Sequence, residues 1–173
     1  VGRIYTRNKY ESIPFPELKD IVSEVSTKER YEFNTEGNIN LAVIDYGVEK
    51  GTLKCLAKRG CKVTVFNSKV SSDEILNGNF DCVFLSSGPG NPEKCKDEIE
   101  TVKKLTGKIP LFGICLGCQI LAIALGAKTY KLKYGHRGSN HPVINLKNNK
   151  IIITSQNHGY SVDEKTLTGL MNL

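Results

Sequence analysis

From residue 39 onward, short apolar runs alternate with segments in which apolar residues recur every three or four positions. Short apolar runs bounded by turn residues predict buried strands, and the wider spacing predicts amphipathic helices. The expected strands are 39–45, 62–66, 81–86 and 109–114, and the expected helices are 48–59, 71–77, 93–105 and the segment from the fourth strand to residue 125. This alternation predicts an α/β fold with an open, mostly parallel, flavodoxin-like sheet and helices on both faces.

The two ends of the chain depart from this alternation. Residues 1–38 are polar and contain Pro14 and Pro16, with one short helix expected over 15–25. We interpret 1–38 as the tail of a preceding domain plus a linker, and 39–173 as a second domain. In that second domain, three late apolar runs predict a meander of strands at 128–132, 143–146 and 151–154. Because the chain begins with Val1 and not with methionine, we expect it to be a fragment or a processed product.

Composition narrows the class of protein. A chain of 173 residues that is 39% hydrophobic can bury a substantial core. No apolar run approaches the roughly 18 residues that a membrane helix needs, and the N-terminus shows no secretory signal pattern, so no membrane contact is expected. The six cysteines fall inside apolar or helical patterns, which favours free thiols in a reducing compartment, the cytoplasm.

The formal net charge of +6 raises the question of nucleic acid binding. The lysines are scattered and not grouped in a stripe, and they suit solvated helix faces better than a nucleic-acid surface. Representative positions are Lys54, Lys58, Lys94, Lys96, Lys103 and Lys104. We therefore expect no nucleic acid partner. A phosphate-binding loop is disfavoured as well, because Gly126-Ala127-Lys128-Thr129 follows a helix and lacks the upstream glycine.

The candidate chemistry centres on Gly113-Ile114-Cys115-Leu116-Gly117, which joins a predicted strand to a predicted helix. This is the thiol version of the Gly-x-Ser-x-Gly nucleophile elbow, in which glycines permit a sharp turn. The free amides and the dipole at the start of the helix favour a thiolate and can hold an oxyanion. Three alternatives stay open from the residues: an inert helix-start cysteine, a Cys115–Cys118 CxxC redox pair, and a zinc site, which lacks a second ligand pair of matching spacing.

Other loops are expected beside this elbow, because ligands bind at the carboxyl ends of strands in an open parallel sheet. One is Asp45-Tyr46-Gly47, and another contains Gly88-Pro89-Gly90. The second is either a tight turn or the source of a further oxyanion-binding amide. A reactive cysteine also needs a base. Of the histidines at 136, 141 and 158, residue chemistry favours His158, which follows a strand.

Six stretches, taken together and in order, resemble the class I (triad-type) glutamine amidotransferase domain of glutamine-dependent carbamoyl-phosphate synthetase. They are Asp45-Tyr46-Gly47, Ser87-Gly88-Pro89-Gly90-Asn91-Pro92, Phe112-Gly113-Ile114-Cys115-Leu116-Gly117-Cys118-Gln119, Gly126-Ala127-Lys128-Thr129, Gly135-His136-Arg137-Gly138-Ser139-Asn140-His141-Pro142 and Thr154-Ser155-Gln156-Asn157-His158-Gly159-Tyr160. The resemblance covers about 39–173, and residues 18–31 resemble the junction after the family's N-terminal small-subunit domain.

The resemblance implies a glutaminase. Cys115 would attack the side-chain amide of glutamine, releasing ammonia and leaving a glutamyl thioester that water hydrolyses. The amides of Gly88 and Leu116 would form the oxyanion hole. The glutamine-binding positions would be Gly88, Gly90, Leu116, Gln119, Asn157, Gly159 and Tyr160. This domain would need no cofactor. Its ammonia would pass to a large subunit or fused synthetase domain that uses ATP and Mg, in pyrimidine or arginine biosynthesis.

The chain also departs from the family pattern. The family's base and acid lie in a later His-Pro-Glu motif, which does not occur before Leu173, so the domain is expected to be truncated at its C-terminus. His158 matches a histidine that lies near the site without being the main base. Cys118 stands where many relatives have histidine. The resemblance therefore leaves a second hypothesis, a catalytically incomplete module that docks on and regulates the synthetase; alone, the fragment would be inactive or weakly active.

Overall fold

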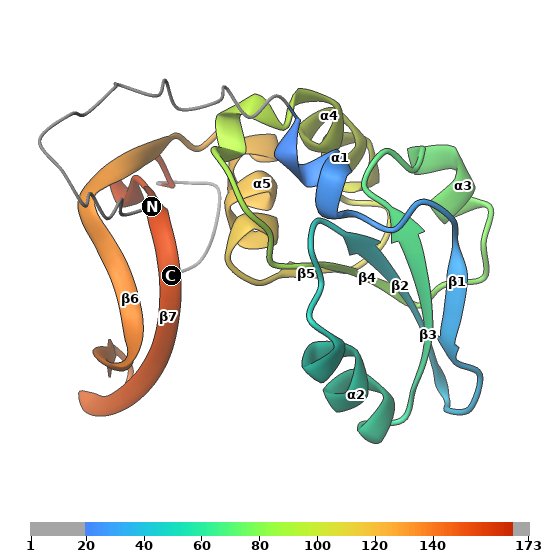
Figure 1. The fold of residues 1–173 in the computed structure, drawn as a ribbon, viewed down its shortest axis with the longest axis horizontal. Helices are drawn as coiled ribbons and strands as arrows, with labels where there is room; N and C mark the ends of the chain where they lie inside the picture. Colours follow the sequence, from blue (N-terminus) through green and yellow to red (C-terminus); the bar gives the residue numbers. More distant parts are fainter. Residues whose placement is uncertain (1–19, 168–173) are drawn as a thin grey trace, which may run out of the picture.

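Five strands form one sheet in the computed structural model, which describes residues 20–167 (Figure 1). The sheet order is β1-β3-β2-β4-β5. The strands are β1 (Tyr31–Asn34), β2 (Ile39–Asp45), β3 (Cys61–Asn67), β4 (Cys82–Leu85) and β5 (Leu111–Gly113). β2 to β5 are parallel, and β1 lies antiparallel to β3 at one edge. The predicted α/β class with a mostly parallel sheet is confirmed.

Helices cover both faces of the sheet, as the sequence pattern predicts. They are α1 (Ile21–Val25), α2 (Lys50–Lys58), α3 (Ser72–Leu76), α4 (Lys96–Leu105) and α5 (Leu116–Ala124), with short 3-10 turns η1 (Pro92–Lys94) and η2 (Glu164–Thr166). None of these described helices has the length and apolarity that crossing a membrane requires.

The two faces have separate cores, because successive side chains of a strand point to opposite faces. In β2, Leu41 and Val43 pack in a cluster with Leu53 of α2. Ala42 and Ile44 instead belong to the cluster on the other face, which also contains residues of α1, α4 and α5. The loops at the carboxyl ends of these strands therefore extend from a sheet that is buried on both faces.

The segment that precedes β2 also packs on this sheet. Val22 of α1 is only 2% exposed and belongs to the core, and β1 extends the sheet as an edge strand. We did not predict this strand, because Tyr31–Asn34 is only four residues long and none of its residues is buried. Of the helix expected over 15–25, the structure shows α1; residues 15–19 lie outside the described residues. The domain boundary at residue 38 stays a prediction.

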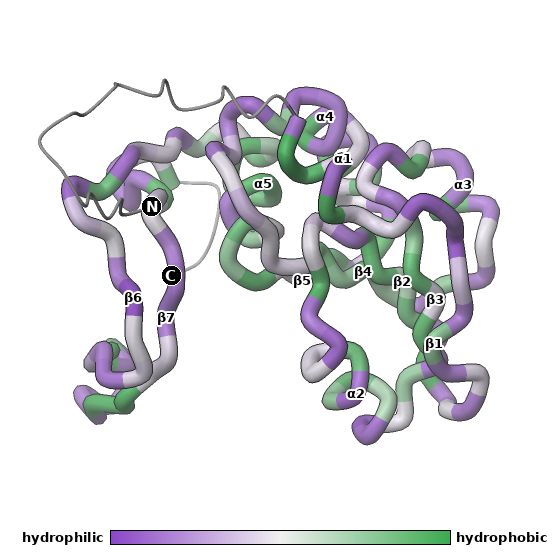
Figure 2. Tube along the Cα trace, viewed as in Figure 1, coloured by the Kyte–Doolittle hydropathy of each residue, from purple (hydrophilic) through white to green (hydrophobic). Residues whose placement is uncertain are grey.

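Two long strands form a separate antiparallel hairpin, β6 (Thr129–Asn145) and β7 (Lys150–Val162). The expected meander of three short strands is therefore wrong, because the polar residues between the apolar runs continue the ladder across register shifts. In Figure 1 this hairpin stands beside the α5 end of the molecule, away from the sheet. Figure 2 shows apolar residues at its far tip, where Leu146, Ile151 and Ile153 are 80%, 68% and 62% exposed.

Asp45, at the end of β2, fastens the preceding segment to the sheet. Its side chain, in a residue only 5% exposed, accepts hydrogen bonds from the N–H groups of Thr27 (2.8 Å), Gly47 (2.8 Å) and Val48 (2.7 Å). We expect Asp45→Ala to lower the free energy of unfolding in urea by about 2–4 kcal/mol, because three amides lose an ionised acceptor. Asp81→Ala removes one bond, to the Asn40 N–H at an exposed site, and should cost about 1 kcal/mol or less. Equal losses would contradict this role for Asp45.

Candidate active site

The strand-to-helix turn at Cys115 has the strained geometry of a nucleophile elbow. Cys115 has φ 53° and ψ −111°, a conformation that side-chain-bearing residues rarely adopt and that is typical of functional turns. The turn is held from both sides: the Gly117 N–H donates to Ser86 O (3.0 Å), and the Gln119 N–H donates to Cys115 O (3.0 Å). A Cβ on Gly117 would lie 2.2 Å from Leu85 O, so only glycine lets α5 approach β4 this closely. The elbow is therefore built by the sheet and by α5 together.

A second loop touches the elbow at Gly88. A Cβ on this residue would lie 2.2 Å from Tyr46 O and 2.8 Å from Leu116 Cδ2, so the Gly88 backbone is wedged between the β2 loop and the start of α5. Within residues 20–167, neither the Gly88 N–H nor the Leu116 N–H has a hydrogen-bond acceptor. The two amides predicted to bind an oxyanion thus belong to residues that pack against each other, and both amides are uncommitted. Their role stays a prediction.

Strand β7 of the hairpin forms the third wall of the site. The Cys115 thiol lies 4.0 Å from the Asn157 carbonyl oxygen. The Gln119 side chain, from α5, donates through Nε2 to the Tyr160 carbonyl at 2.8 Å. Gln119 is buried at 8% exposure, and its bond joins α5 directly to β7. The segment from Asn157 to Tyr160 is therefore placed beside the nucleophile by side chains of the elbow helix.

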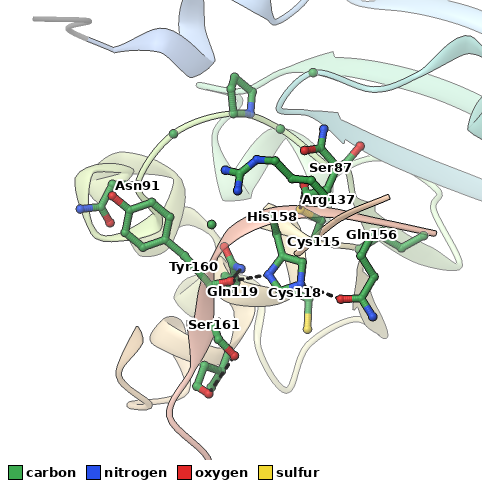
Figure 3. A pocket seen from close by; sticks show the side chains of 18 of the residues that line it. Ser87, Asn91, Cys115, Cys118, Gln119, Arg137, Gln156, His158, Tyr160 and Ser161 are labelled. Atoms are coloured by element: carbon green, nitrogen blue, oxygen red, sulfur yellow. Dashed lines mark hydrogen bonds between the residues drawn. The ribbon is translucent and has the colours of Figure 1, made fainter. Parts of the chain in front are cut away.

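These three walls enclose an open cavity of about 1160 Å³ (Figure 3). Most of the sequence-predicted site residues line it: Gly88, Gly90, Cys115, Gln119, Asn157, His158, Gly159 and Tyr160. Leu116 does not, because this residue is buried in the core at 1% exposure, and the role of its backbone amide stays a prediction. The cavity is of a size that suits a small polar ligand with room for solvent.

The cavity also contains residues that the sequence reasoning missed. Lys131 and Arg137 line it from β6, where they pair with Tyr160 and Asn157 of β7. Glu49 and Thr52 line it from the start of α2. The only signal for the two cations was the register of the hairpin, which joins positions far apart in sequence. Their positive charges can attract a carboxylate of a ligand in this cavity.

The three histidines of the chain gather on the hairpin. His158 Nδ1 lies 2.8 Å from the Tyr160 carbonyl oxygen, and its Nε2 lies 2.9 Å from Gln156 Oε1 and 3.2 Å from His136 Nδ1. A carbonyl can only accept, so Nδ1 donates to Tyr160. Figure 3 draws the bonds to Tyr160 and Gln156 as dashed lines. Both ring nitrogens of His158 lie within hydrogen-bond distance of groups of the hairpin, so the ring is placed to support β7; its near-site role stays a prediction.

Burial raises the pKa of one thiol in the cavity and of one thiol in the core. Burial, and after it the charge of Cys115, raise the pKa of the Cys118 thiol. Burial raises the pKa of Cys95, in the core, to about 12, with a contribution from Glu98. Among the described residues, no group of three or more His, Cys, Asp or Glu side chains is arranged to hold a metal ion. The cavity combines a strained cysteine, free amides and polar side chains, which are the kinds of groups that acyl transfer by a thiol nucleophile uses.

Comparisons with known proteins identify the relatives of this chain. A family model described as "Glutamine amidotransferase class-I" matches residues 42–171. The chain is 52% identical over 144 residues to a carbamoyl phosphate synthase small chain of Clostridium perfringens, covering 83% of this chain and 41% of that protein. It is 46% identical over 171 residues to that of Chlorobaculum tepidum, covering 95% of this chain and 47% of that protein.

The chain thus spans less than half the length of the curated relatives that it matches. Among solved structures, a putative GMP synthase protein of Thermoplasma acidophilum is similar, with a TM-score of 0.63 and 23% identity. The similarity covers 73% of this chain and 67% of that chain. At 23% identity this similarity shows a shared fold and nothing more.

Proposed function

Because the chain belongs to the class-I glutamine amidotransferase family, we propose that it hydrolyses glutamine as part of the small-chain component of a carbamoyl-phosphate synthetase. The observation that carries the proposal is the strained Cys115 elbow, which opens into a cavity beside two uncommitted amides. A buried structural cysteine would need none of these features. The similarity to small chains, at 46–52% identity, supports the choice of synthetase among the activities of the family.

In the proposed reaction, the Cys115 thiolate attacks the side-chain carbonyl carbon of glutamine. The amides of Gly88 and Leu116 then stabilise the oxyanion that forms, in the manner of an oxyanion hole. The C–N bond breaks, the nitrogen takes up a proton and leaves as ammonia, and a glutamyl thioester stays on Cys115. Water then hydrolyses the thioester to glutamate and restores the thiol. The base and its acidic partner are proposed to come from the family's later His-Pro-Glu motif.

Recognition of the substrate's amino-acid portion is assigned to the wall formed by β7 and the neighbouring loop. The assigned residues are Gly90, Gln119, Asn157, Gly159 and Tyr160. The Gln119 side-chain amide already donates a hydrogen bond to the Tyr160 carbonyl, so its proposed role in substrate recognition includes holding this wall in place. Arg137 and Lys131 add positive charge on the same side for the α-carboxylate.

The ammonia requires an acceptor, which we propose to be a large subunit or fused synthetase domain. That partner would use ATP and Mg with bicarbonate to make carbamoyl phosphate in the cytoplasm, for pyrimidine or arginine biosynthesis. The amidotransferase domain itself would use no cofactor. The residues that line the cavity, Cys115 among them, support the thiol mechanism proposed for this domain.

A second candidate function, non-catalytic docking on the synthetase, is favoured by two features of the hairpin. The hairpin tip exposes aliphatic side chains such as Leu146, Ile151 and Ile153. The hairpin also carries five cations, Lys131, Lys133, Arg137, Lys147 and Lys150, and its sequence from 129 to 162 contains no Asp or Glu. A two-stranded hairpin of this kind gains stability when another surface covers its apolar side.

Labelling with a glutamine-analogue diazo ketone separates the two candidates. We expect one label per chain, found on Cys115 by peptide mass spectrometry. Glutamine should slow this labelling. Glutamate analogues that lack the reactive group should not change which residue is labelled. Cys55, which is exposed on α2, is the internal control and should stay unlabelled while remaining reactive to iodoacetamide. A folded protein that is not labelled at Cys115 would favour docking over hydrolysis.

A further inference from the structure

Cys118 is a second thiol that lines the cavity, and it has no role in the proposed hydrolysis. We propose that Cys118 and Cys115 form a reversible disulfide under oxidation by hydrogen peroxide, which blocks the nucleophile and protects it from irreversible oxidation. The formation of the disulfide is independent of the proposed function, whereas its effect on glutamine hydrolysis rests on that function.

The two cysteines occupy positions of one helix turn that bring side chains together. Cys115 is the N-cap of α5, and Cys118 is the third residue of that helix. The bond from the Gln119 N–H to Cys115 O shows that this first turn is formed. The N-cap and the third helical residue are neighbours in capping boxes, where each side chain reaches the backbone N–H of the other residue, and CxxC disulfides of oxidoreductases occur at helix starts. The Cys115 side chain makes no capping hydrogen bond to α5, and its only described contact is the one at 4.0 Å with the Asn157 carbonyl oxygen, which rotation toward Cys118 gives up.

The cavity gives this pair an access to small oxidants that the buried thiols lack. Both sulfurs belong to residues that line the open cavity, where a small oxidant can enter. Cys61 and Cys95 are buried in the two cores. The charge of Cys115 contributes to the raised pKa of Cys118, which means that the two groups interact.

The disulfide between Cys115 and Cys118 forms in two steps. The Cys115 thiolate attacks one oxygen of hydrogen peroxide, the O–O bond breaks, and a sulfenic acid and, after protonation, one water are formed. The Cys118 sulfur then attacks the Cys115 sulfur, the S–O bond breaks, and the hydroxyl leaves with the Cys118 proton as a second water. Two thiols are oxidised and one peroxide is reduced. A dithiol such as dithiothreitol reverses the change by thiol–disulfide exchange.

The disulfide can be read directly, because both cysteines lie in the single tryptic peptide between Lys108 and Lys128. Full-length protein is treated with a small excess of hydrogen peroxide, blocked with iodoacetamide and mapped without reduction. We expect this peptide to lose two hydrogens and to carry no iodoacetamide label. Addition of oxygen atoms to Cys115 in place of the hydrogen loss would overturn the proposal.

Two variants test the function of the disulfide. After peroxide and then dithiothreitol, wild type and Cys55→Ser should recover labelling of Cys115 by the glutamine analogue. Cys118→Ser should be labelled before oxidation but fail to recover, because its Cys115 proceeds to sulfinic acid. Recovery in Cys118→Ser equal to that of wild type would refute the protective role. If the disulfide forms in a protein that the analogue never labels, the proposed hydrolysis fails while the disulfide stands.

Discussion

Cys115→Ser, introduced into the full-length protein, is expected to reduce kcat for glutamine hydrolysis by at least about 10³-fold, because the thioester can no longer form. The KM for glutamine should change little, since the cavity walls formed by Gly88 and β7 are unaltered. Glutamate formation, measured in an enzyme-coupled assay, checks the effect. Serine has nearly the size of cysteine, so the strained elbow should keep its conformation.

The control for this experiment is the synthesis that uses free ammonia. With the synthetase partner present, the Cys115→Ser protein should support carbamoyl phosphate formation from ammonia as well as the unmodified protein does. Cys55→Ser, on the exposed side of α2, should leave both activities unchanged. A Cys115→Ser protein that hydrolyses glutamine at the original rate would remove Cys115 from the mechanism.

The sequence predicted the parts of the fold whose signal is local. β2 and β4 are buried on both faces and appear as continuous apolar runs, and Gly113 to Gly117 specifies a turn through residues that are adjacent in the chain. β1 gave no such signal, because an edge strand that is mostly exposed needs no apolar pattern. It is fixed by pairing with β3 and by the bond from Thr27 to Asp45, both of which join distant positions.

The same distinction applies to the candidate site. The loops at the carboxyl ends of β2, β4 and β5 converge as a parallel sheet requires, so the neighbours of Cys115 on these loops could be predicted. The hairpin contributes through its register, which places Arg137 opposite Asn157 and Lys131 opposite Tyr160. Counted from the tip of the hairpin, one register shift precedes both pairings and a second lies between them. A count along the sequence alone therefore could not have located the two cations.

Gly117→Ala and Gly51→Ala are expected to change stability in opposite directions, although both replace the second residue of a nine-residue helix. A Cβ at position 117 would lie 2.2 Å from Leu85 O and 2.5 Å from Leu85 C, which are backbone atoms of the central sheet. A Cβ at position 51 would meet no atom within 4 Å. We expect Gly117→Ala to lower the free energy of unfolding by about 2–3 kcal/mol, as overpacking does. Gly51→Ala should raise it by up to about 1 kcal/mol, because alanine restricts the unfolded chain.

The functional consequence follows from the place of Gly117 in the elbow. To relieve the overlap, α5 must move away from β4, and the bond from the Gly117 N–H to Ser86 O lengthens. Cys115 and the Leu116 amide move with the helix, so Gly117→Ala should also lose labelling by the glutamine analogue under conditions in which it is still folded. Urea unfolding measures the first effect, and labelling below the unfolding transition measures the second. A Gly117→Ala protein that is destabilised yet labelled at the original rate would show that the close packing of α5 on β4 serves stability alone and does not set the geometry of the nucleophile.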